Sequence, residues 1–499
     1  MNIRITMIGF LLSLVTAVTS AQITPPKTPL ELKAYTSLTS HFEMTYYLRM
    51  LASFNPKMKL DIIGKSEGGR DIYCVRISET EFGADNSKLK VLLFAQQHGD
   101  EPSGKEGLLL LLRDVSVGKY DELLKVADVM VVPQVNPDGA ELQKRRNGQD
   151  ADLNRNHLIL TQNESAALHH LFNRWLPHVT LDVHEYSPFG KDWIEYGFRK
   201  DFDEQFGTLT NPNADADIVE CMKNEFLPFI ESYLNSRAVS FHQYIVGGPP
   251  NIERLRYSTV DINDGRQSLG IRGTFSMILE GKNGIDSLDR IQERSEKQYA
   301  AVAGYLEFIQ THHQKIKDMV TNARNHLTNA QFDYVYTQME HVASDAPLEM
   351  NLLDVGDNTM KKTTVYNYHP VVQPLDSVKA PLGYLLPAND SRFKALMRKH
   401  YLQSEPADMN KFGKLQQYRI SKVTKIEREG EMILFPELLT EEIDAAQIQG
   451  NYLFVPLKQL SSKWLMLAFE PQSMIGLVQY PEYNDLLKEG SIYPVIRVH

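Results

Sequence analysis

The sequence predicts an α/β fold for the larger, N-terminal part of the chain and a smaller α+β domain after it. Between residues 22 and 330, apolar runs of strand length alternate with longer segments of helical periodicity. Such alternation is typical of a sheet that carries helices on both faces. From residue 331 onward the segments become short, strand-like and separated by turns. Because 499 residues is long for one domain, we predict two domains, at residues 22–330 and 331–499.

The strands and helices of the first domain follow from the periodicity of its apolar residues. Continuous apolar runs predict buried strands at residues 60–63, 72–77, 91–94, 129–133, 179–183 and 275–279. Helical periodicity predicts helices at residues 40–52, 106–113, 164–175 and 218–234, and a long helix from about residue 287 into the 320s. Because a proline inside a helix removes one backbone hydrogen bond, we expect a kink at Pro228.

The second domain is rich in short strands. We expect strands at residues 332–336, 382–387, 418–420, 430–434 and 452–456, a helix at 391–400, and either a helix or a strand at 464–469. Residues 351–362 are polar and turn-rich. No new metal-binding or nucleophile motif occurs, and the isolated His369, His400 and His499 favour surface or structural roles. The sequence leaves three roles open for this domain: controlling access to the first domain, stabilising it, or binding cell-surface material.

The N-terminus has the pattern of a secretory signal peptide. Arg4 precedes an apolar run at residues 8–18, and the small residues Thr19-Ser20-Ala21 follow it. This run is too short to span a bilayer. We therefore expect cleavage near Ala21, a secreted or periplasmic protein, and no membrane attachment after cleavage.

The net charge bears on nucleic-acid binding, and the cysteine content bears on disulfide formation. A net charge of -10, without any Lys/Arg-rich run, gives no reason to expect nucleic-acid binding. The two cysteines, Cys74 and Cys221, form one disulfide only if the fold brings them together, which the sequence does not settle. Cys74 lies in the middle of a predicted strand, so we expect it to be a buried free thiol.

A candidate metal site is the most informative feature of the chain. His98-Gly99-Asp100-Glu101 follows the apolar run at residues 91–95, and His184 follows the run at 179–183. Two imidazoles and one carboxylate, with a fourth position open, are typical of a catalytic zinc site. Strand ends are also where sites form on open α/β sheets. The pair His98 and Glu101 alone is weak evidence, since a buried, satisfied histidine beside an unrelated glutamate gives the same pattern.

Further motifs between these segments give a more specific resemblance. They are Asn136-Pro137-Asp138-Gly139, Arg145-Arg146-Asn147 and Asp152-Leu153-Asn154-Arg155-Asn156. With Tyr46-Tyr47-Leu48, Ile63-Gly64-Lys65-Ser66 and Gly69-Arg70, their order resembles the zinc carboxypeptidases of the carboxypeptidase A type, the M14 metallopeptidases. The resemblance extends to about residue 315. It implies a mixed, mostly parallel sheet flanked by helices and a metallocarboxypeptidase that hydrolyses the C-terminal peptide bond of peptides.

The resemblance assigns roles around one Zn²⁺ ion. His98, Glu101 and His184 match the zinc ligands. Asp152 matches the acid that orients the first ligand histidine, a contact that fixes its tautomer and raises its basicity. Glu280, at the end of a predicted strand, matches the general base that takes a proton from the zinc-activated water.

The resemblance also assigns substrate-binding residues. Arg145 matches the arginine that stabilises the oxyanion, although the adjacent Arg146 is an alternative. Asn154 and Arg155 match the pair that holds the substrate's free C-terminal carboxylate, for which a planar guanidinium is well suited. Without the zinc motif, these arginines would indicate a solvated basic patch, and Glu280 would indicate an ordinary carboxylate at a strand end.

The sequence departs from the family in two places. The family's loop tyrosine has no clear counterpart; we rank Tyr257 before Tyr244, and a structural aromatic is the alternative for each. Near the base, Arg266 and Arg272 suggest a preference for an acidic C-terminal residue.

Other functions are weighed against this one. A zinc-dependent N-acyl amino acid deacylase of the aspartoacylase type resembles the same His-x-x-Glu and distant histidine, but the motifs at 136–139 and 152–156 favour the peptidase. A non-catalytic peptide-binding relative would have lost residues that are present here. A structural zinc site conflicts with only three protein ligands. Whether the substrate is a protein peptide or a cell-wall peptide stays open.

Overall fold

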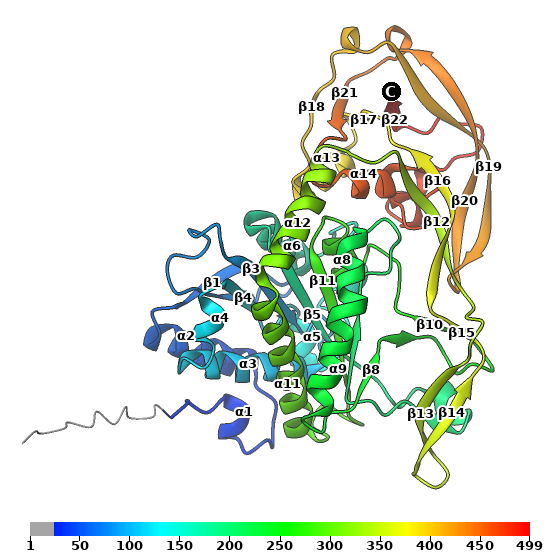
Figure 1. Cartoon of the computed structure of the whole chain (residues 1–499). Helices are drawn as coiled ribbons and strands as arrows, with labels where there is room; N and C mark the ends of the chain where they lie inside the picture. The colour runs from blue at the N-terminus through cyan, green and yellow to red at the C-terminus, as the bar shows by residue number, and fades with distance from the viewer. Residues whose placement is uncertain (1–23) are drawn as a thin grey trace, which may run out of the picture.

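One large sheet forms the framework of the first part of the molecule. The computed structural model describes residues 24–499 (Figure 1), so the signal peptide expected up to Ala21 lies outside the described residues. Eight strands pair in the order β1-β2-β4-β3-β5-β11-β7-β8. Their bounds are β1 (Met58–Lys65), β2 (Asp71–Ile77), β3 (Leu89–Ala95), β4 (Ala127–Val132), β5 (Val179–Tyr186), β7 (Glu204–Gly207), β8 (Phe241–Gln243) and β11 (Phe275–Lys282).

The pairing of these strands confirms the predicted mixed α/β sheet. The central strands β4, β3, β5 and β11 run parallel to one another, while β1, β2 and β7 pair with their neighbours β2, β4 and β11 in antiparallel fashion. All six predicted strands are present. The short β7 and β8 were not predicted, since segments of four and three residues carry too few apolar positions to show a period.

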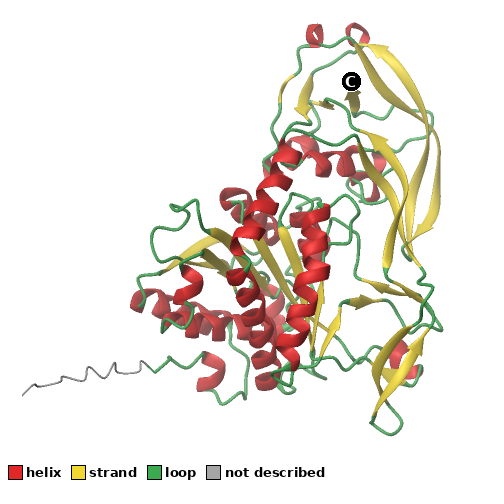
Figure 2. Cartoon of the chain, in the orientation of Figure 1, coloured by secondary structure: helices red, strands yellow, loops and turns green. Residues whose placement is uncertain are grey.

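Helices cover both faces of the sheet, as the alternation of strand side chains requires (Figure 2). Val91 and Leu93 of β3 belong to one apolar core with α2, α3, α9 and α11, whereas Leu92 and Phe94 pack in another core with α6. The helix bounds are α1 (Pro29–Leu32), α2 (His41–Phe54), α3 (Pro102–Ser116), α4 (Asp121–Leu124), α5 (Pro137–Leu142), α6 (Asn163–Trp175), α7 (Lys191–Glu195), α8 (Ala216–Cys221), α9 (Leu227–Asn235), α10 (Gly265–Gly270), α11 (Ile291–Thr311) and α12 (His313–Thr328).

Two predicted helices differ from the structure in continuity. The helix expected at 218–234 is α8 and α9 joined by a wide turn of π type at Met222–Phe226, directly before Pro228. In a turn of π type the backbone bonds run from residue i to i+5, and this wider spacing accommodates Pro228, whose nitrogen has no hydrogen to donate. The long helix expected from residue 287 is two helices, α11 and α12, which meet at His312.

The remainder of the chain is built mainly from antiparallel strands. Six of them form a sheet in the order β18-β21-β17-β22-β19-β20. The bounds in this part are β12 (Tyr334–Val342), β13 (Leu348–Asp354), β14 (Met360–Val365), β15 (Tyr368–His369), β16 (Val371–Lys379), β17 (Gly383–Pro387), α13 (Ser391–His400), β18 (Glu405–Pro406), β19 (Lys414–Arg428), β20 (Glu431–Asp444), β21 (Tyr452–Pro456), α14 (Ser462–Phe469) and β22 (Ile496–Val498). The open assignment at 464–469 is therefore a helix, and the turn-rich segment at 351–362 spans the β13–β14 hairpin.

The two parts share a continuous apolar core and a few strand pairs. Trp464 and Phe469 of α14 belong to the same buried cluster as Leu158, Ile262 and Ile271 from the first part. In addition, β6 (Phe198–Arg199) pairs with β13, and β10 (Leu255–Tyr257) pairs with β15 and with β9 (Ile245–Val246). The position of the domain boundary, between residues 330 and 331, stays a prediction. It falls between the end of α12 and the start of β12.

Several smaller expectations can be compared with the structure. Cys74 and Cys221 are both buried free thiols, as we predicted for Cys74. His400 is buried and hydrogen-bonded, in agreement with a structural role, whereas His499 is exposed. Within residues 24–499, none of the helices combines the length and the apolar character needed to cross a bilayer.

Candidate metal centre

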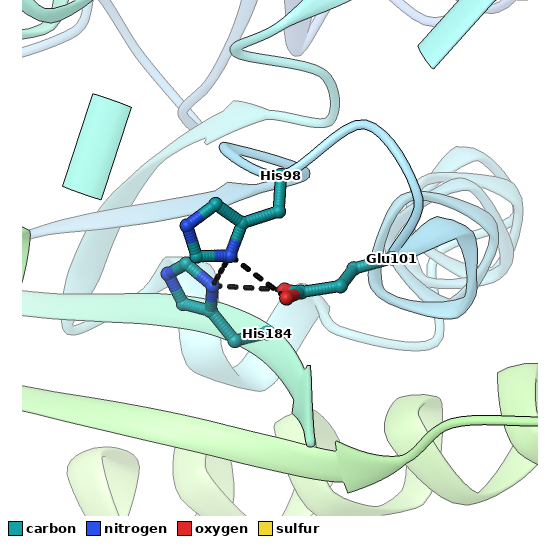
Figure 3. Close-up of side chains that lie close together, drawn as sticks. All are labelled: His98, Glu101 and His184. Atoms are coloured by element: carbon teal, nitrogen blue, oxygen red, sulfur yellow. Dashed lines mark hydrogen bonds and ion pairs between the residues drawn. The ribbon is translucent and has the colours of Figure 1, made fainter. Parts of the chain in front are cut away.

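Three side chains from two strand ends converge on one point. His98 and Glu101 lie in the turn between β3 and α3, and His184 lies near the carboxyl end of β5, the neighbouring parallel strand. Glu101 Oε1 is 2.8 Å from His98 Nδ1, Glu101 Oε2 is 2.9 Å from His184 Nδ1, and the two Nδ1 atoms are 3.2 Å apart. All three side chains are buried and point toward one another (Figure 3).

The outer nitrogen of each imidazole faces a carboxylate. His98 Nε2 lies 3.1 Å from Asp152 Oδ1, and His184 Nε2 lies 2.8 Å from Asp182 Oδ1. Because a carboxylate only accepts, both Nε2 atoms carry the proton and both Nδ1 atoms present lone pairs. Arg145 Nη1, which donates to His98 Nδ1 over 3.1 Å, requires the same tautomer.

This arrangement fits a divalent metal ion. Two unprotonated nitrogens and a carboxylate in mutual contact repel one another unless a cation lies between them. Ligands about 2.0–2.1 Å from a tetrahedral zinc lie roughly 3.3 Å apart, close to the separations of these three atoms. Histidine and carboxylate ligands with hydrogen-bonded outer partners are the set that zinc sites use.

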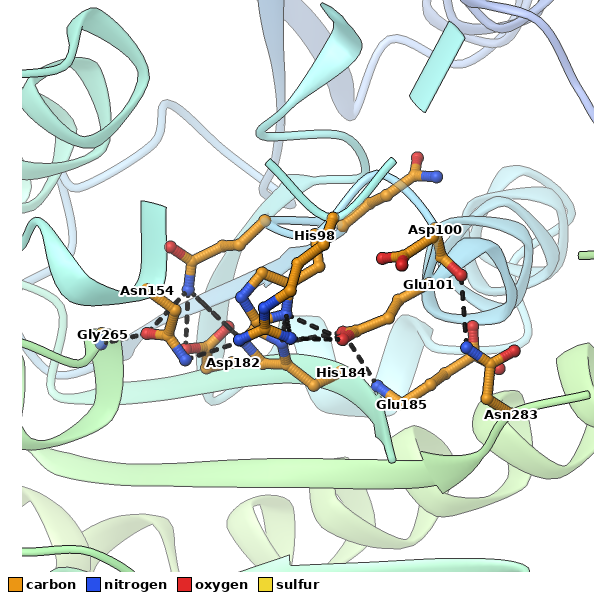
Figure 4. Close-up of polar contacts among 12 residues, drawn as sticks. His98, Asp100, Glu101, Asn154, Asp182, His184, Glu185, Gly265 and Asn283 are labelled. Atoms are coloured by element: carbon orange, nitrogen blue, oxygen red, sulfur yellow. Dashed lines mark hydrogen bonds and ion pairs between the residues drawn. The ribbon is translucent and has the colours of Figure 1, made fainter. Parts of the chain in front are cut away.

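Asp182 was not predicted, although the sequence contained a signal for it. Side chains two residues apart on a strand lie on the same face, so Asp182 and His184 of β5 project together. Asp182 is fully buried (0% exposed), and Figure 4 shows it beside His184 among the polar contacts around the centre.

Glu280 lies on the strand next to that of His184. In the β5–β11 pairing, Glu280 is directly opposite His184 in register. Its carboxylate is buried, and burial raises the pKa of Glu280 to about 7, with the nearby charge of Glu101 contributing in the same direction. A carboxylate with a pKa in this range can both accept and return a proton near neutral pH.

Of the two candidate arginines, Arg145 lies at the centre and Arg146 does not. Besides its contact with His98, the Arg145 guanidinium lies 3.4 Å from Glu101 Oε1 and 3.0 Å from Asp152 Oδ2. Arg146 instead donates to the backbone oxygen of Asp150. Arg145 is half-exposed, so its guanidinium is accessible to a molecule that enters the site.

Asn154 and Arg155 follow Asp152 on a short helical turn at Leu153–Arg155. Asn154 Nδ2 lies 3.4 Å from His184 Nε2, and its Oδ1 accepts from the backbone N–H of Gly265 over 2.8 Å. Arg155 Nη1 donates to the backbone oxygen of Asn154. Asn154 therefore lies beside the ligand His184, and Arg155 follows it on the same turn.

Arg155 opens onto a pocket that both parts of the chain form. The pocket has a volume of about 210 Å³. Its walls include Tyr244, Asp261 and Asp264 from the first part, and Arg428 and Glu431 from the β19–β20 hairpin. The fold therefore places a segment more than 270 residues away in sequence beside Arg155.

The two tyrosine candidates occupy different environments. The hydroxyl of Tyr257 is buried and bonds the side chain and backbone of Thr208, at 2.9 and 3.2 Å. Tyr244 lines the pocket beside Arg155. The geometry thus brings Tyr244, not the first-ranked Tyr257, to the candidate site, because Thr208 occupies the Tyr257 hydroxyl.

The arginines proposed to attract an acidic residue do not face the pocket as free charges. Arg266 is fully buried and pairs with Asp264 at 2.8 Å. Arg272 donates to His400 Nδ1 at the junction of the two parts of the chain. Both guanidinium groups are bound by protein partners, so neither is free to attract an acidic C-terminal residue.

The mixed α/β sheet and the His-Glu-His cluster are the features expected of a metal-dependent hydrolase. Comparison with known proteins agrees. Residues 44–175 match the zinc carboxypeptidase family, a range that contains His98, Glu101 and Arg155 and ends before His184 and Glu280. The chain is similar to the zinc carboxypeptidases, the M14 metallopeptidases, and this similarity indicates a hydrolase of that kind.

Individual relatives and solved structures show the extent of the similarity. Carboxypeptidase 2 of Trichophyton rubrum is 24% identical over 472 residues, which cover 91% of this chain and 86% of the relative. Mouse carboxypeptidase D is 28% identical over 132 residues, covering 23% of this chain and 10% of the relative. A metallo-carboxypeptidase from Burkholderia cenocepacia has a TM-score of 0.43 and 17% identity, over 56% of this chain and 71% of that chain. The deacylase alternative is not favoured.

Proposed function

We propose that this protein is a secreted zinc metallocarboxypeptidase that removes one residue from the C-terminus of a peptide. The observation that carries the proposal is the convergence of the lone pairs of His98, Glu101 and His184 beside a buried carboxylate, Glu280. A single Zn²⁺ ion would be held by the three ligands. The N-terminal pattern around Ala21 supports secretion.

Glu280 and Arg145 divide the chemistry of the peptide bond between them. Zinc held by the three ligands would supply an activated water and polarise a carbonyl. Glu280 would accept a proton from a water at the centre and return it to the leaving amine. Arg145 donates N–H groups to the carbonyl oxygen as that oxygen gains negative charge. Asp152 and Asp182 hold the two ligand histidines in the required tautomer.

Asn154 and Arg155 hold the free C-terminal carboxylate of the substrate. A guanidinium presents two parallel N–H donors to a carboxylate, and the Asn154 amide adds another donor. Their position between the metal centre and the pocket supports this role, since the last peptide bond would then reach the metal while the last side chain enters the pocket.

The Asp261 carboxylate in the pocket favours a basic C-terminal residue. Asp261 lines the pocket, and within the described residues it forms no ion pair; one of its oxygens accepts from the Asn263 N–H. Burial raises the pKa of Asp261 to about 7. A lysine or arginine side chain from the substrate would supply the cation that this carboxylate lacks.

A peptide assay with controlled metal content tests this function. Metal-stripped enzyme should be inactive and zinc should restore it, and peptides with an amidated C-terminus should be cleaved far more slowly than the free acids. Asp261→Asn should lower kcat/KM for a Lys-ended peptide by about 10- to 100-fold and leave a Phe-ended peptide nearly unchanged. Equal cleavage of amidated and free peptides would contradict the carboxylate clamp, and an equal effect on both peptides would contradict the role of Asp261.

A further inference from the structure

We propose that Gln97 and His157 are positioning residues for the metal centre, which act by holding Asp182 and, through it, the ligand His184. The proposal rests on the proposed function, in which His184 binds zinc. Neither residue touches the three ligand atoms that converge at the centre. Their role follows from a buried chain of hydrogen bonds that begins at His184 and runs away from the metal.

The chain of hydrogen bonds is continuous over five side chains. His184 Nε2 lies 2.8 Å from Asp182 Oδ1. Gln97 Nε2 donates to both oxygens of Asp182, over 3.0 and 2.8 Å. Gln97 Oε1 lies 2.8 Å from His157 Nε2, and His157 Nδ1 lies 3.0 Å from His169 Nε2.

The donor and acceptor of each hydrogen bond in this series follow from the Asp182 carboxylate. Asp182 can only accept, so the amide nitrogen of Gln97 must face it and Gln97 Oε1 must face His157. That oxygen in turn requires a proton on His157 Nε2, which leaves Nδ1 to accept from His169 Nε2–H. Burial lowers the pKa of His157 to about 4, so the ring is neutral near pH 7 and carries one proton, as this pattern needs.

The surroundings leave these groups little freedom to rearrange. Asp182, Gln97, His157 and His169 are all fully buried, each 0% exposed. A methyl group on Gly265 would lie 2.7 Å from Asp182 Oδ2, 3.1 Å from Gln97 Nε2 and 3.3 Å from His157 Cε1. The cluster is therefore closed by backbone on the Gly265 side.

Gln97 gives the buried Asp182 carboxylate its second hydrogen-bonding partner. A buried carboxylate that loses a donor bears the desolvation cost of the unpaired oxygen and is no longer held in place on that side. Movement of Asp182 loosens the hydrogen bond that orients His184. Outer-shell contacts of this kind typically contribute 10- to 100-fold to metal affinity.

A further histidine, His400 in the second part of the chain, lies next to His169. The His169 and His400 rings lie 5.3 Å apart, and His400 of α13 accepts from Arg272 Nη2 over 2.7 Å. His400 Nε2 donates to the backbone oxygen of Leu158, next to His157. The segment that carries His157 is thus held from both sides, by α6 and by α13.

Two substitutions of His157 test the proposal as a matched pair. The amide nitrogen of a glutamine reaches the place of Nε2 and can still donate to Gln97, whereas an asparagine reaches only the place of Nδ1. In the full-length protein, His157→Asn should raise the zinc dissociation constant, measured by chelator competition, by about 10- to 100-fold. His157→Gln should remain close to wild type. Gln97→Met, which keeps the side-chain length but has no donor, should behave like His157→Asn.

The control is His178, a half-buried histidine just before β5, at the end of that strand away from His184, whose Nδ1 accepts from the Lys90 N–H. His178→Asn should leave zinc affinity unchanged. Should Gln97→Met not fold, the His157 pair still decides the question. Equal zinc affinity in His157→Asn, His157→Gln and wild type would overturn the proposal, whereas a wild-type protein that binds no zinc would instead refute the proposed function.

Discussion

Glu280 is the single residue on which turnover depends most directly in the proposed mechanism. Replacing it with glutamine removes the proton acceptor but keeps the side-chain shape. We expect Glu280→Gln to retain zinc and to bind peptide normally, while kcat falls by about 10²- to 10⁴-fold. Stopped-flow or steady-state assays with a short peptide measure this change.

Glu204 provides a matched control for that substitution. It is also a buried carboxylate, on the adjacent strand β7, and it pairs in register with Gly281 rather than facing the ligands. Burial holds the pKa of Glu204 well above its usual range, so a neutral glutamine resembles its normal state. Glu204→Gln should therefore keep its turnover; if Glu280→Gln also does, the base assignment is wrong.

Among single residues, the sequence predicted which side chains form the metal centre. It did not predict which other residues hydrogen-bond the remaining candidate side chains. His98, Glu101 and His184 converge as the motifs implied. The contact of the Tyr257 hydroxyl with Thr208 could not be predicted, because it depends on how two separate segments pack. Asp182 was within reach of the sequence, through its spacing from His184 on one strand.

At the element scale, the turn between β3 and α3 needs glycine at position 99. A Cβ built there would lie 2.0 Å from the backbone carbon of Gly139 and 2.4 Å from Ala140 N. Because backbone cannot move aside as a flexible side chain does, Gly99→Ala should lower the free energy of unfolding by about 1–3 kcal/mol or more. Zinc affinity should fall with it, since His98 and Glu101 flank this residue.

Chemical denaturation of the metal-free and zinc-loaded proteins measures this effect. Gly413 serves as the control, since a Cβ there meets nothing within 4 Å. Gly413→Ala should leave both quantities nearly unchanged. If Gly99→Ala matches Gly413→Ala in stability and zinc affinity, the close approach of this turn to α5 has no role in shaping the site.

The tip of the β19–β20 hairpin is held by an acid whose charge depends on pH. Glu429 accepts from the backbone N–H of His341 over 2.7 Å, and its carboxylate lies 2.8 Å from Arg256 Nη1. Burial opposes the charged form of Glu429, but its contacts with His341 and Arg256 outweigh this and lower its pKa from 4.5 to about 2. A lowered pKa in the folded state stabilises the protein above pH 4.5, and this stabilisation is lost as the pH falls from about 4.5 to about 2.

Glu429→Gln should consequently lower the free energy of unfolding by about 1.5–3 kcal/mol at pH 7. The difference from wild type should shrink as the pH falls through that window. Urea denaturation at several pH values checks both statements. A difference that is constant with pH would mean that the carboxylate charge does not hold the hairpin.

The boundaries of helices and strands could be predicted where the apolar residues follow a single helical or strand period. They could not be predicted where tertiary packing sets the boundary. The apolar runs of the central strands predicted the sheet, and Pro228 marked a real irregularity. The break at His312 had no sequence signal, since helical periodicity continues through it. The strands at 418–420 and 430–434 are parts of a hairpin that is much longer than its apolar core, because backbone pairing continues through its polar ends.

At the scale of the whole molecule, the second part of the chain covers apolar surface of the first. Leu158, Ile262 and Ile271 lie in one buried cluster with α14 and α13 residues. We expect a fragment of residues 24–330 to expose this cluster, and so to melt well below the full chain or to aggregate. Thermal unfolding and light scattering of the fragment beside residues 24–499 measure this.

If the fragment of residues 24–330 stays soluble and keeps the melting temperature of the full chain, the second part of the chain does not stabilise the first. The sequence left its role open among access, stabilisation and surface binding. The shared core supports stabilisation, and the pocket wall at Arg428 and Glu431 supports a part in access. Neither contact could be read from the sequence, since both join segments that only the folded chain brings together.

X-ray absorption at the zinc K-edge, on protein loaded with one equivalent of zinc, tests the three-ligand site most directly. A site formed by His98, Glu101 and His184 gives nitrogen and oxygen neighbours at about 2.0–2.1 Å, including two imidazoles, and loses one imidazole in His184→Ala. Sulfur neighbours, an unchanged imidazole count in His184→Ala, or failure of the wild-type protein to retain zinc would contradict it.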